Sequence, residues 1–462
     1  MTESNGTSSN RLRILLVSHG LPPQDVGGVE LYTLRLARLL ARDHDVVLAV
    51  PERRPRPEKD LAFEDRPEGF RVAWIKAQRS KRKFLDMYVD EHVDRVYERL
   101  LDEFRPDVIH VHHILYLSTG ILTCPRRRGI PVLLTLHDFW LNCPRGQRIT
   151  EDGTVCTTID RERCVTCLNP QWDGIHRDFL AAPRRMLLNL MQGKERAREE
   201  LRAFDRHMRE VLSRVDRFVS PSKSMLADFV AYGVDPKKAV RLRYCLDGEL
   251  GVSKEQRKAN GQSRSRAREE GGKLRIGYLG TLIPTKGVHV LTEAYRSLKD
   301  LPVTLDIHGT SPPYRGRQDY VGQLEKSVRD VGGVRFRGPY EQSALPEILK
   351  GLDVVVVPSV WMENFPQTAL EALTAGVPVV AADHGGLAEI VRTGVNGLKF
   401  RPGDPVDLAR KLRQLVDDPG LHKRLCGRGI DIPRPEEHAE AHIGLYREVI
   451  REKAEKTARA QP

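Results

Sequence analysis

Short apolar runs alternate along the chain with segments in which apolar residues recur every three or four positions. Residues 11–17 and 46–50 have the length and composition of buried strands, and residues 29–40 between them have helical spacing. Two further apolar runs, 107–111 and 131–136, also read as strands. Strands that alternate with helices indicate right-handed crossovers and a parallel sheet covered on both faces.

The same alternation returns in the second half of the chain. The pattern predicts strands at 274–280, 303–308, 353–358 and 378–382, and helices at 287–298 and 367–375. Between the halves, residues 251–272 have almost no large apolar side chains and are rich in Gly, Ser, Lys and Arg. Such a segment cannot bury a core, so we expect a flexible polar linker or loop there.

These patterns predict an α/β fold in which the 462 residues form two Rossmann-like domains. Two regions of the first domain depart from the alternation: a loop with four cysteines and a long charged helical insertion. The predicted division is a disordered tail at 1–10, a first domain at 11–235 with the Cys-rich loop at 142–172 and the insertion at 180–214, the polar segment at 251–272, a second domain at 273–433, and a closing helix and tail at 434–462.

Composition excludes several classes of protein. Forty per cent of residues are hydrophobic and 30% are charged, which suits a soluble globular chain and not a disordered one. No apolar run approaches the ~20 residues of a membrane helix. Residues 1–10 lack the apolar core of a secretory signal, so we expect a cytoplasmic protein.

The net charge of +12, from 75 basic and 63 acidic residues, suggests an anionic partner. No zinc-finger, RRM or basic-zipper signature is present and aromatic residues are only 6%, so we expect no nucleic-acid partner. Basic patches at 53–56, 79–83 and 126–128 suit a peripheral contact with an anionic membrane, at the inner membrane face. An ordinary solvated surface explains these patches nearly as well.

Candidate functional residues follow the predicted strands, where ligands bind in doubly wound sheets. Gly27 and Gly28 open the first helix, and His137 follows the strand 131–136. In the second domain, Gly280 and Lys286 lie in a loop that opens a helix, and a lysine at a helix N-terminus is suited to a diphosphate. The Gly-Lys-Ser/Thr order of a Walker A loop is missing.

Two carboxylates, Glu363 and Glu371, follow the strand 353–358. Eight helical residues span ~12 Å, whereas the carboxylates of a retaining glycosidase lie ~5–5.5 Å apart. The pair therefore suits two ends of an extended ligand better than one scissile bond. Gly385, Gly386 and Glu389 form a turn after the strand 378–382, at the same edge of the sheet.

This set of motifs resembles the retaining glycosyltransferases of family 4, also called group 1 glycosyltransferases. The resemblance covers about residues 11–403, and the element Glu363-x7-Glu371 is its most specific part. It implies the two-domain GT-B fold and transfer of a sugar, typically a hexose, from a nucleotide-sugar donor to a glycan or lipid-linked glycan. Such enzymes serve in the biosynthesis of cell-surface polysaccharides and glycoconjugates.

The resemblance also implies roles for single residues. Glu371 would hold the ribose hydroxyls, Glu363 the donor sugar, and Lys286 the diphosphate. The backbone of Asn364, Phe365 and Pro366 would line the sugar and phosphates, and His137 would lie near the sugar. Gly27 and Gly28 would approach the phosphates or the acceptor. The remaining residues expected to bind the donor are Gly280, Gly385, Gly386 and Glu389. The family usually has a second basic residue where this chain has Thr281.

The chemistry implied by the resemblance needs no metal ion. Negative charge grows on the departing diphosphate, and a lysine and helix N-termini can stabilise it. We therefore expect His137, Lys286 and Glu363 to be catalytic, with no cofactor required for catalysis. The nucleotide would bind the second domain and the acceptor the first, with closure of the cleft completing the site.

Four cysteines lie within 25 residues in the spacing Cys143-x12-Cys156-x7-Cys164-x2-Cys167. In a cytoplasmic protein, four thiolates this close in sequence are candidate ligands of a structural Zn²⁺. Four unligated thiols are an equal alternative, and an iron–sulfur cluster is a less favoured one. A metal here would hold the loop beside the acceptor cleft and have no catalytic role.

Two other functions share this architecture. One is a UDP-sugar 2-epimerase-like enzyme, which would turn over its nucleotide-sugar with no acceptor. The other is a catalytically silent nucleotide-sugar-binding protein. The combination of Lys286, Glu363, Glu371 and His137 disfavours the silent protein, whereas Thr281 leaves room for it.

Overall fold

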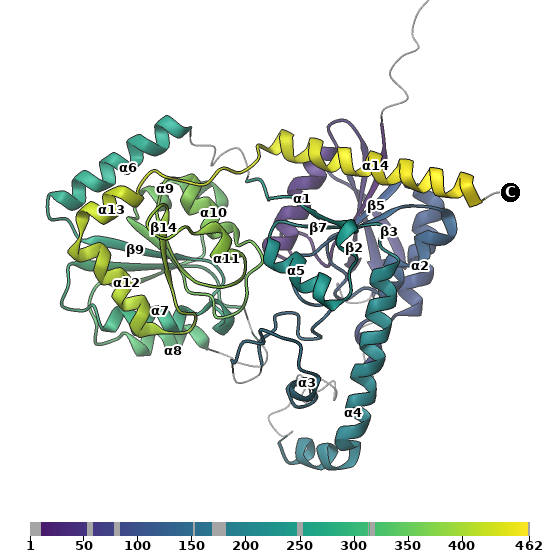
Figure 1. Ribbon diagram of the computed structural model, residues 1–462, viewed down its shortest axis with the longest axis horizontal. Coiled ribbons are helices and arrows are strands. Elements are labelled where there is room, and N and C mark those ends of the chain that lie inside the picture. The colour runs from purple at the N-terminus through teal and green to yellow at the C-terminus, as the bar shows by residue number, and fades with distance from the viewer. Residues whose placement is uncertain are drawn as a thin grey trace, which may run out of the picture.

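The protein consists of two α/β lobes that lie next to each other (Figure 1). The computed structural model describes residues 11–52, 59–77, 84–150, 153–168, 182–246, 253–312, 314 and 319–460. The predicted tail at 1–10 and the basic patches at 53–56 and 79–83 lie outside the described residues.

The first domain is built on an eight-stranded sheet with the order β3-β4-β2-β1-β5-β6-β7-β8. Neighbouring strands are parallel except β3, which runs antiparallel to β4. The central strands β1 and β5 are buried along almost their whole length because helices cover both faces of the sheet. The strands are β1 (Arg13–Val17), β2 (Asp45–Glu52), β3 (Leu61–Asp65), β4 (Arg71–Lys76), β5 (Val108–Val111), β6 (Val132–Thr135), β7 (Arg217–Ser220) and β8 (Ala239–Arg241).

The helices of the first domain include the predicted insertion, which projects from the lobe together with α3 (Figure 1). Cys164 and Cys167 lie on α3, so part of the region predicted as a Cys-rich loop is helical. The described part of the 180–214 insertion is the single helix α4. The helices are α1 (Gly28–Leu40), α2 (Glu91–Phe104), α3 (Arg161–Leu168), α4 (Ala182–Ser213) and α5 (Lys223–Tyr232).

The second domain has a six-stranded parallel sheet with the order β11-β10-β9-β12-β13-β14. The predicted strands of this half are confirmed, and the sequence pattern missed β11 and β14 at the two edges. The strands are β9 (Leu274–Leu279), β10 (Val303–His308), β11 (Val334–Gly338), β12 (Val354–Val357), β13 (Val379–Ala382) and β14 (Gly397–Phe400). The helices that cover this sheet are α7 (Val288–Arg296), α8 (Tyr320–Ser327), α9 (Leu345–Lys350), α10 (Gln367–Thr374), α11 (Gly385–Ile390), α12 (Pro405–Asp417) and α13 (Pro419–Leu425).

The prediction of a flexible polar segment at 251–272 is wrong for most of its length, because Lys254–Glu269 form helix α6. Arg264 on this helix is buried, and its guanidinium donates to the carbonyl oxygens of Leu352 and Leu349 at 2.9 and 3.1 Å. A Cβ on Gly261 would meet the backbone nitrogen of Gly427 at 2.9 Å, so the helix packs directly against the backbone at Gly427. These contacts use a buried arginine and a glycine, and composition alone does not reveal them.

The last helix, α14 (Pro435–Ala460), leaves the second domain and lies along the first (Figure 1). Its polar side chains enter the interior of the first domain: the Tyr32 hydroxyl hydrogen-bonds His438 at 2.9 Å, and the Tyr446 hydroxyl hydrogen-bonds His110 at 2.7 Å. His438, His442 and Tyr446 are all buried. The helix therefore ties the end of the chain to the first sheet.

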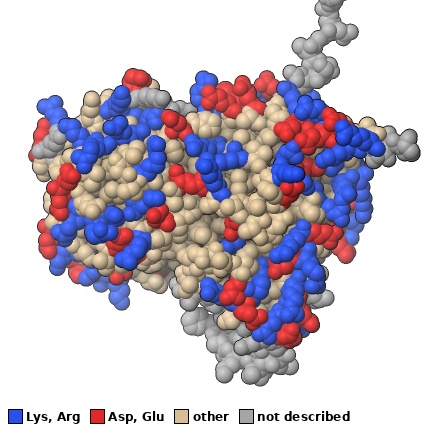
Figure 2. Space-filling view, viewed as in Figure 1, with Lys and Arg blue, Asp and Glu red and all other residues tan. Residues whose placement is uncertain are grey.

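None of the described helices combines the length and apolar composition needed to cross a membrane. Figure 2 shows Lys and Arg side chains interspersed with Asp and Glu over the visible face of both lobes.

The histidines of α14 predict acid sensitivity. Burial lowers the pKa of His438 to about 2 and that of His442 to about 4. Below the unfolded-state value near 6.5 the unfolded chain takes up protons that the folded chain does not, so the free energy of unfolding falls as pH falls from about 6.5 towards 4, by up to about 1.4 kcal/mol per pH unit for each histidine. Urea unfolding at pH 7.5, 6.5 and 5.5 measures this slope. We expect a shallower slope for a His438→Gln/His442→Gln variant, and equal slopes would contradict the account.

Candidate active site

A cavity of about 500 Å³ lies between the two domains, at the carboxyl ends of both sheets. Most of the residues that the sequence singled out line it. From the first domain these are Gly27, Gly28 and His137, and from the second Gly280, Thr281, Lys286, Glu363, Asn364, Phe365, Pro366 and Glu371.

Lys286 and Glu363 form an ion pair in this cavity. The Lys286 ammonium lies 2.6 Å from Glu363 Oε1 and 5.5 Å from the centre of the Trp361 ring. The same oxygen accepts hydrogen bonds from Ser359 Oγ at 2.7 Å and from Trp361 Nε1 at 2.9 Å. A carboxylate that accepts three donors is held in one orientation, and a lysine can turn from it towards an incoming anion.

Close backbone packing places Lys286. The lysine ends the short 3₁₀ turn Pro284–Lys286, and Gly287 follows with a positive φ of 73° before α7 begins. A Cβ on Gly287 would come within 1.9 Å of the Pro358 carbonyl oxygen. Only glycine permits this approach, which brings Lys286 next to the β12 loop that carries Glu363.

Glu371 lies on α10, which begins directly after Pro366. Its side chain is buried, and Gln342 Nε2 donates to Glu371 Oε1 at 3.3 Å. Glu363 and Glu371 thus belong to one cavity but to different elements, the loop and the helix, as the sequence predicted.

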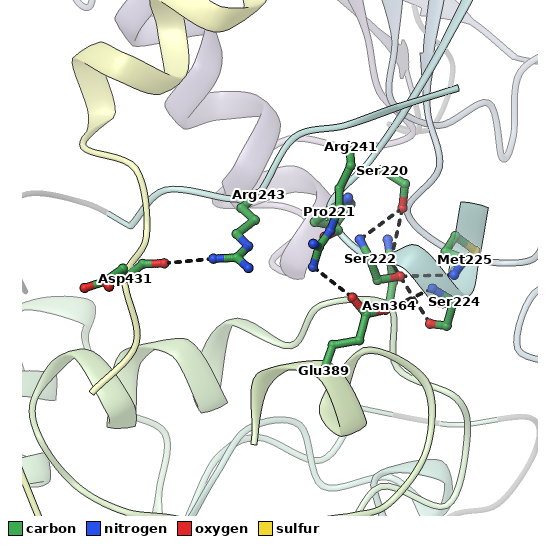
Figure 3. A network of polar contacts seen from close by, with 10 residues as sticks. All are labelled: Ser220, Pro221, Ser222, Ser224, Met225, Arg241, Arg243, Asn364, Glu389 and Asp431. Atoms are coloured by element: carbon green, nitrogen blue, oxygen red, sulfur yellow. Dashed lines mark hydrogen bonds and ion pairs between the residues drawn. The ribbon is translucent and has the colours of Figure 1, made fainter. Parts of the chain in front are cut away.

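Asn364 connects the two domains through its side chain (Figure 3). Its Oδ1 accepts a hydrogen bond from Ser222 Oγ at 2.7 Å, and its Nδ2 donates to the Leu136 carbonyl at 2.6 Å. Ser222 caps α5 and Leu136 directly precedes His137, so both partners belong to the first domain. The loop that carries Glu363 is therefore fixed against the opposite wall of the cleft.

Glu389 also faces the first domain, outside the described lining of the cavity. It accepts from Arg241 Nη2 and from the Ser224 amide, both at 2.9 Å (Figure 3). Gly385 and Gly386 lie beneath the loop, where a Cβ would come within 2.5 Å of the Glu363 carbonyl oxygen and 1.5 Å of the Asn364 carbonyl oxygen, respectively. The structure therefore gives this turn contacts that support the loop and bridge the domains.

His137 lines the cavity, but both of its ring nitrogens have protein partners. Nδ1 shares a hydrogen bond of 2.6 Å with the Tyr244 hydroxyl, and Nε2 one of 3.2 Å with His112 Nδ1. Burial lowers the pKa of His137 to about 3, so the ring is neutral at physiological pH. The side chain orients Tyr244, which also lines the cavity, and carries no charge there.

Asp138 is the next residue on the same wall. Its Oδ2 lies 3.2 Å from His113 Nε2, and its Oδ1 accepts from the Trp140 amide at 2.9 Å. Behind it, His19 Nε2 lies 3.0 Å from Glu30 Oε1, and the rings of His19 and His113 are 4.3 Å apart. A network of two carboxylates and two histidines therefore supports this side of the cleft.

Sequence reasoning missed several residues of the cavity. Asp138 directly follows the predicted His137, and Ser359 and Trp361 lie on the loop before Glu363. Their positions just after predicted strands could have identified them. Tyr244 belongs to no recognisable motif, and only the fold brings it to His137.

Comparison with known proteins agrees with this geometry. The pattern of the family described as "Glycosyltransferase Family 4" matches residues 26–245, and that of "Glycosyl transferases group 1" matches residues 260–430. The two matches fall on the two domains and together take in most of the chain. The chain belongs to the group 1 glycosyltransferases.

Curated glycosyltransferases match this chain over part of their length. A D-inositol 3-phosphate glycosyltransferase of Streptomyces bingchenggensis is 30% identical over 230 residues, which are 47% of this chain and 48% of that protein. The one of Thermomonospora curvata is 32% identical over 232 residues, which are 47% of this chain and 52% of that protein. The chain thus spans about half the length of the curated relatives it matches.

Solved structures share the fold over the whole chain. The Anabaena protein HepE in complex with UDP and glucose has a TM-score of 0.58 and 17% identity, and the match covers 97% of this chain and 100% of that one. Sucrose-phosphate synthase of Thermosynechococcus elongatus has a TM-score of 0.63 and 17% identity, covering 97% and 99%. The two-domain GT-B architecture expected of this family is confirmed.

The four cysteines of the Cys-rich region line one small cavity of about 30 Å³, and none forms a disulfide. Burial raises the pKa of the Cys167 thiol to about 11, and the other three cysteines also raise this pKa. Within the described ranges, no group of three or more His, Cys, Asp or Glu side chains is arranged to hold a metal ion. The four sulfur atoms would have to draw together to bind zinc, so the zinc site stays a prediction.

Metal analysis decides between zinc and free thiols. If the predicted zinc is present, protein purified without chelator should contain zinc in equimolar amount, and a Cys164→Ser/Cys167→Ser variant should lose it because a structural site needs all four ligands. The control Cys124→Ser, outside the cluster, should keep the metal. Wild-type protein with neither zinc nor iron would identify the four residues as unligated thiols.

Proposed function

We propose that this chain is a retaining glycosyltransferase that moves a sugar from a nucleotide-sugar donor to a glycan or lipid-linked glycan. The observation that carries the proposal is the Lys286–Glu363 pair in a cavity between the two domains. In this assignment the second domain binds the donor, with Glu371 on the ribose, Glu363 on the sugar and Lys286 on the diphosphate.

Charge development in the reaction explains why these residue types are needed. As the bond between the anomeric carbon and the diphosphate breaks, negative charge grows on the diphosphate. Lys286 is the one Lys or Arg in the described lining, so its ammonium supplies the compensating charge. The acceptor oxygen forms the new bond to the anomeric carbon, and its proton goes to the departing phosphate oxygen.

The contacts of Glu363 support attack on the same face of the sugar. A covalent route needs a carboxylate that is free to attack the anomeric carbon. Glu363 Oε1 already accepts hydrogen bonds from Lys286, Ser359 and Trp361, which stabilise its charge and make it a poor nucleophile. Retention by front-face attack needs no covalent intermediate and is the route we propose.

The similar proteins narrow the candidate substrates. The Anabaena neighbour was solved with UDP and with UDP-glucose, which makes UDP-glucose the first donor to test. The curated relatives are named for D-inositol 3-phosphate, whereas the family resemblance favours a glycan in the synthesis of cell-surface polysaccharide or glycoconjugate. Phosphorylated polyols and neutral glycans are thus the two classes of acceptor to compare.

Nucleotide binding and donor hydrolysis test the proposal. We expect one of UDP, GDP or ADP to raise the melting temperature with or without EDTA, because a ligand of the folded state stabilises it. The matching nucleotide-sugar should release nucleotide slowly without acceptor. Lys286→Met should lower this rate about 10²–10³-fold, by analogy with the loss of one charge-stabilising donor. The control Lys299→Met, on the exposed surface of the same domain, should leave it unchanged.

The same assay separates the alternatives. A UDP-sugar 2-epimerase-like enzyme would return an epimerised nucleotide-sugar with no free sugar. A silent nucleotide-sugar-binding protein would show the thermal shift without turnover. No shift with any nucleotide would contradict the proposal altogether.

Peripheral membrane contact is part of the proposal because a lipid-linked acceptor lies at the membrane. Arg126 and Arg127 are exposed on the first domain. We expect vesicles of phosphatidylcholine with phosphatidylserine to retain the protein at low salt and release it at high salt, since surface charges are screened. Arg126→Gln/Arg127→Gln should weaken retention, and equal binding to neutral vesicles would contradict the prediction.

A further inference from the structure

The wall that the first domain presents to the cavity carries a negative charge and no basic residue among its described members. It comprises Gly27, Gly28, His137, Asp138 and Tyr244 together with three apolar residues, Val26, Val29 and Leu31. If the second domain holds the donor, as proposed above, this wall faces the acceptor. We call it the acceptor wall.

Asp138 is the charged side chain of the acceptor wall, and its partners fix it as a hydrogen-bond acceptor. The Leu115 amide donates to His113 Nδ1 at 3.0 Å, so a neutral His113 carries its proton on Nε2 and donates it to Asp138 Oδ2. The Asp138 side chain is 27% exposed, compared with 7% for His113. The carboxylate therefore meets the cavity while the histidine behind it stays inside.

The groups around Asp138 keep the wall negative. Although burial opposes ionisation, His113 and the Trp140 amide hold the pKa of Asp138 below its ordinary value. Burial likewise opposes ionisation of Glu30, but the hydrogen bond from His19 lowers its pKa. Burial and the neighbouring His113 lower the pKa of His19, which favours its neutral form. Two ionised carboxylates thus lie on or behind a wall with a neutral His137.

We infer that the acceptor presents the hydroxyls of a neutral sugar or polyol to Asp138, and that a phosphate monoester is excluded from the acceptor wall. A hydroxyl can donate to the carboxylate, whereas a phosphate dianion would be repelled by it and finds no described Lys or Arg on this wall. The inference rests on the proposed function and chooses the neutral class of acceptor over the phosphorylated one.

Matched acceptor pairs test the inference in the full chain. With UDP-glucose as donor, glucose and myo-inositol are compared with glucose 6-phosphate and inositol 3-phosphate, and transfer is separated from hydrolysis by product analysis. We expect the neutral member of each pair to be used about 100-fold better, since like charges in a cleft disfavour binding strongly. Saturation-transfer NMR with UDP bound gives the same comparison for binding alone. Tighter binding or faster transfer of the phosphorylated member would overturn the inference.

An Asp138→Asn variant shows whether the carboxylate is responsible. It keeps the size of the side chain, so we expect the preference for neutral ligands to shrink at least tenfold while the nucleotide still binds to the second domain. The control Asp43→Asn, on the exposed surface of the same domain, should keep the wild-type preference. An unchanged preference in Asp138→Asn would overturn the inference. If the wild type binds GDP or ADP instead of UDP, the acceptor pairs are compared with the matching nucleotide-glucose, and absence of binding to all three nucleotides would instead count against the proposed function.

Discussion

The buried amide of Asn364 is the constraint on which the cleft depends. It is hydrogen-bonded to Ser222 and to the Leu136 carbonyl, and so joins the loop of Glu363 to the strand end that carries His137 and Asp138. A buried amide that loses its partners costs about 1–3 kcal/mol, so opening the cleft requires water to replace these bonds. The ion pair of Arg241 with Glu389 spans the same boundary nearby. The donor side and the acceptor side are therefore positioned by one set of contacts.

Charge is distributed unequally across the cleft that these contacts hold. On the second domain, the Lys286 ammonium lies against Glu363, in the position where a diphosphate would need it. On the first domain, Asp138 is ionised and His137 is kept neutral by burial. The second domain offers the Lys286 ammonium beside the carboxylates of Glu363 and Glu371, whereas the described first-domain wall offers a carboxylate and no Lys or Arg. This difference suits a diphosphate on the second domain and a hydroxyl acceptor on the first. The fold produces this difference by burying histidines and by leaving one lysine partly exposed.

The fold was largely predictable because its central strands are buried on both faces and appear as continuous apolar runs. The Glu363-x7-Glu371 element was predictable because a short loop and one helix contain it. Contacts between distant residues were not: Tyr244 meets His137 across 107 positions, and Glu389 turns towards Arg241 instead of the cavity. Helix α6 was missed because its polar composition predicts an exposed segment. The structure instead buries Arg264, which donates to a main-chain carbonyl, and composition does not reveal such a contact.

The anomeric configuration of the product tests the central claim most directly. ¹H NMR of the early reaction, before mutarotation or hydrolysis, distinguishes an axial from an equatorial anomeric proton on the transferred sugar. Front-face transfer directed by Lys286 and Glu363 predicts that the product keeps the configuration of the donor. An inverted product would mean that a base on the first domain drives attack from the opposite face, and it would contradict the roles assigned to the cleft.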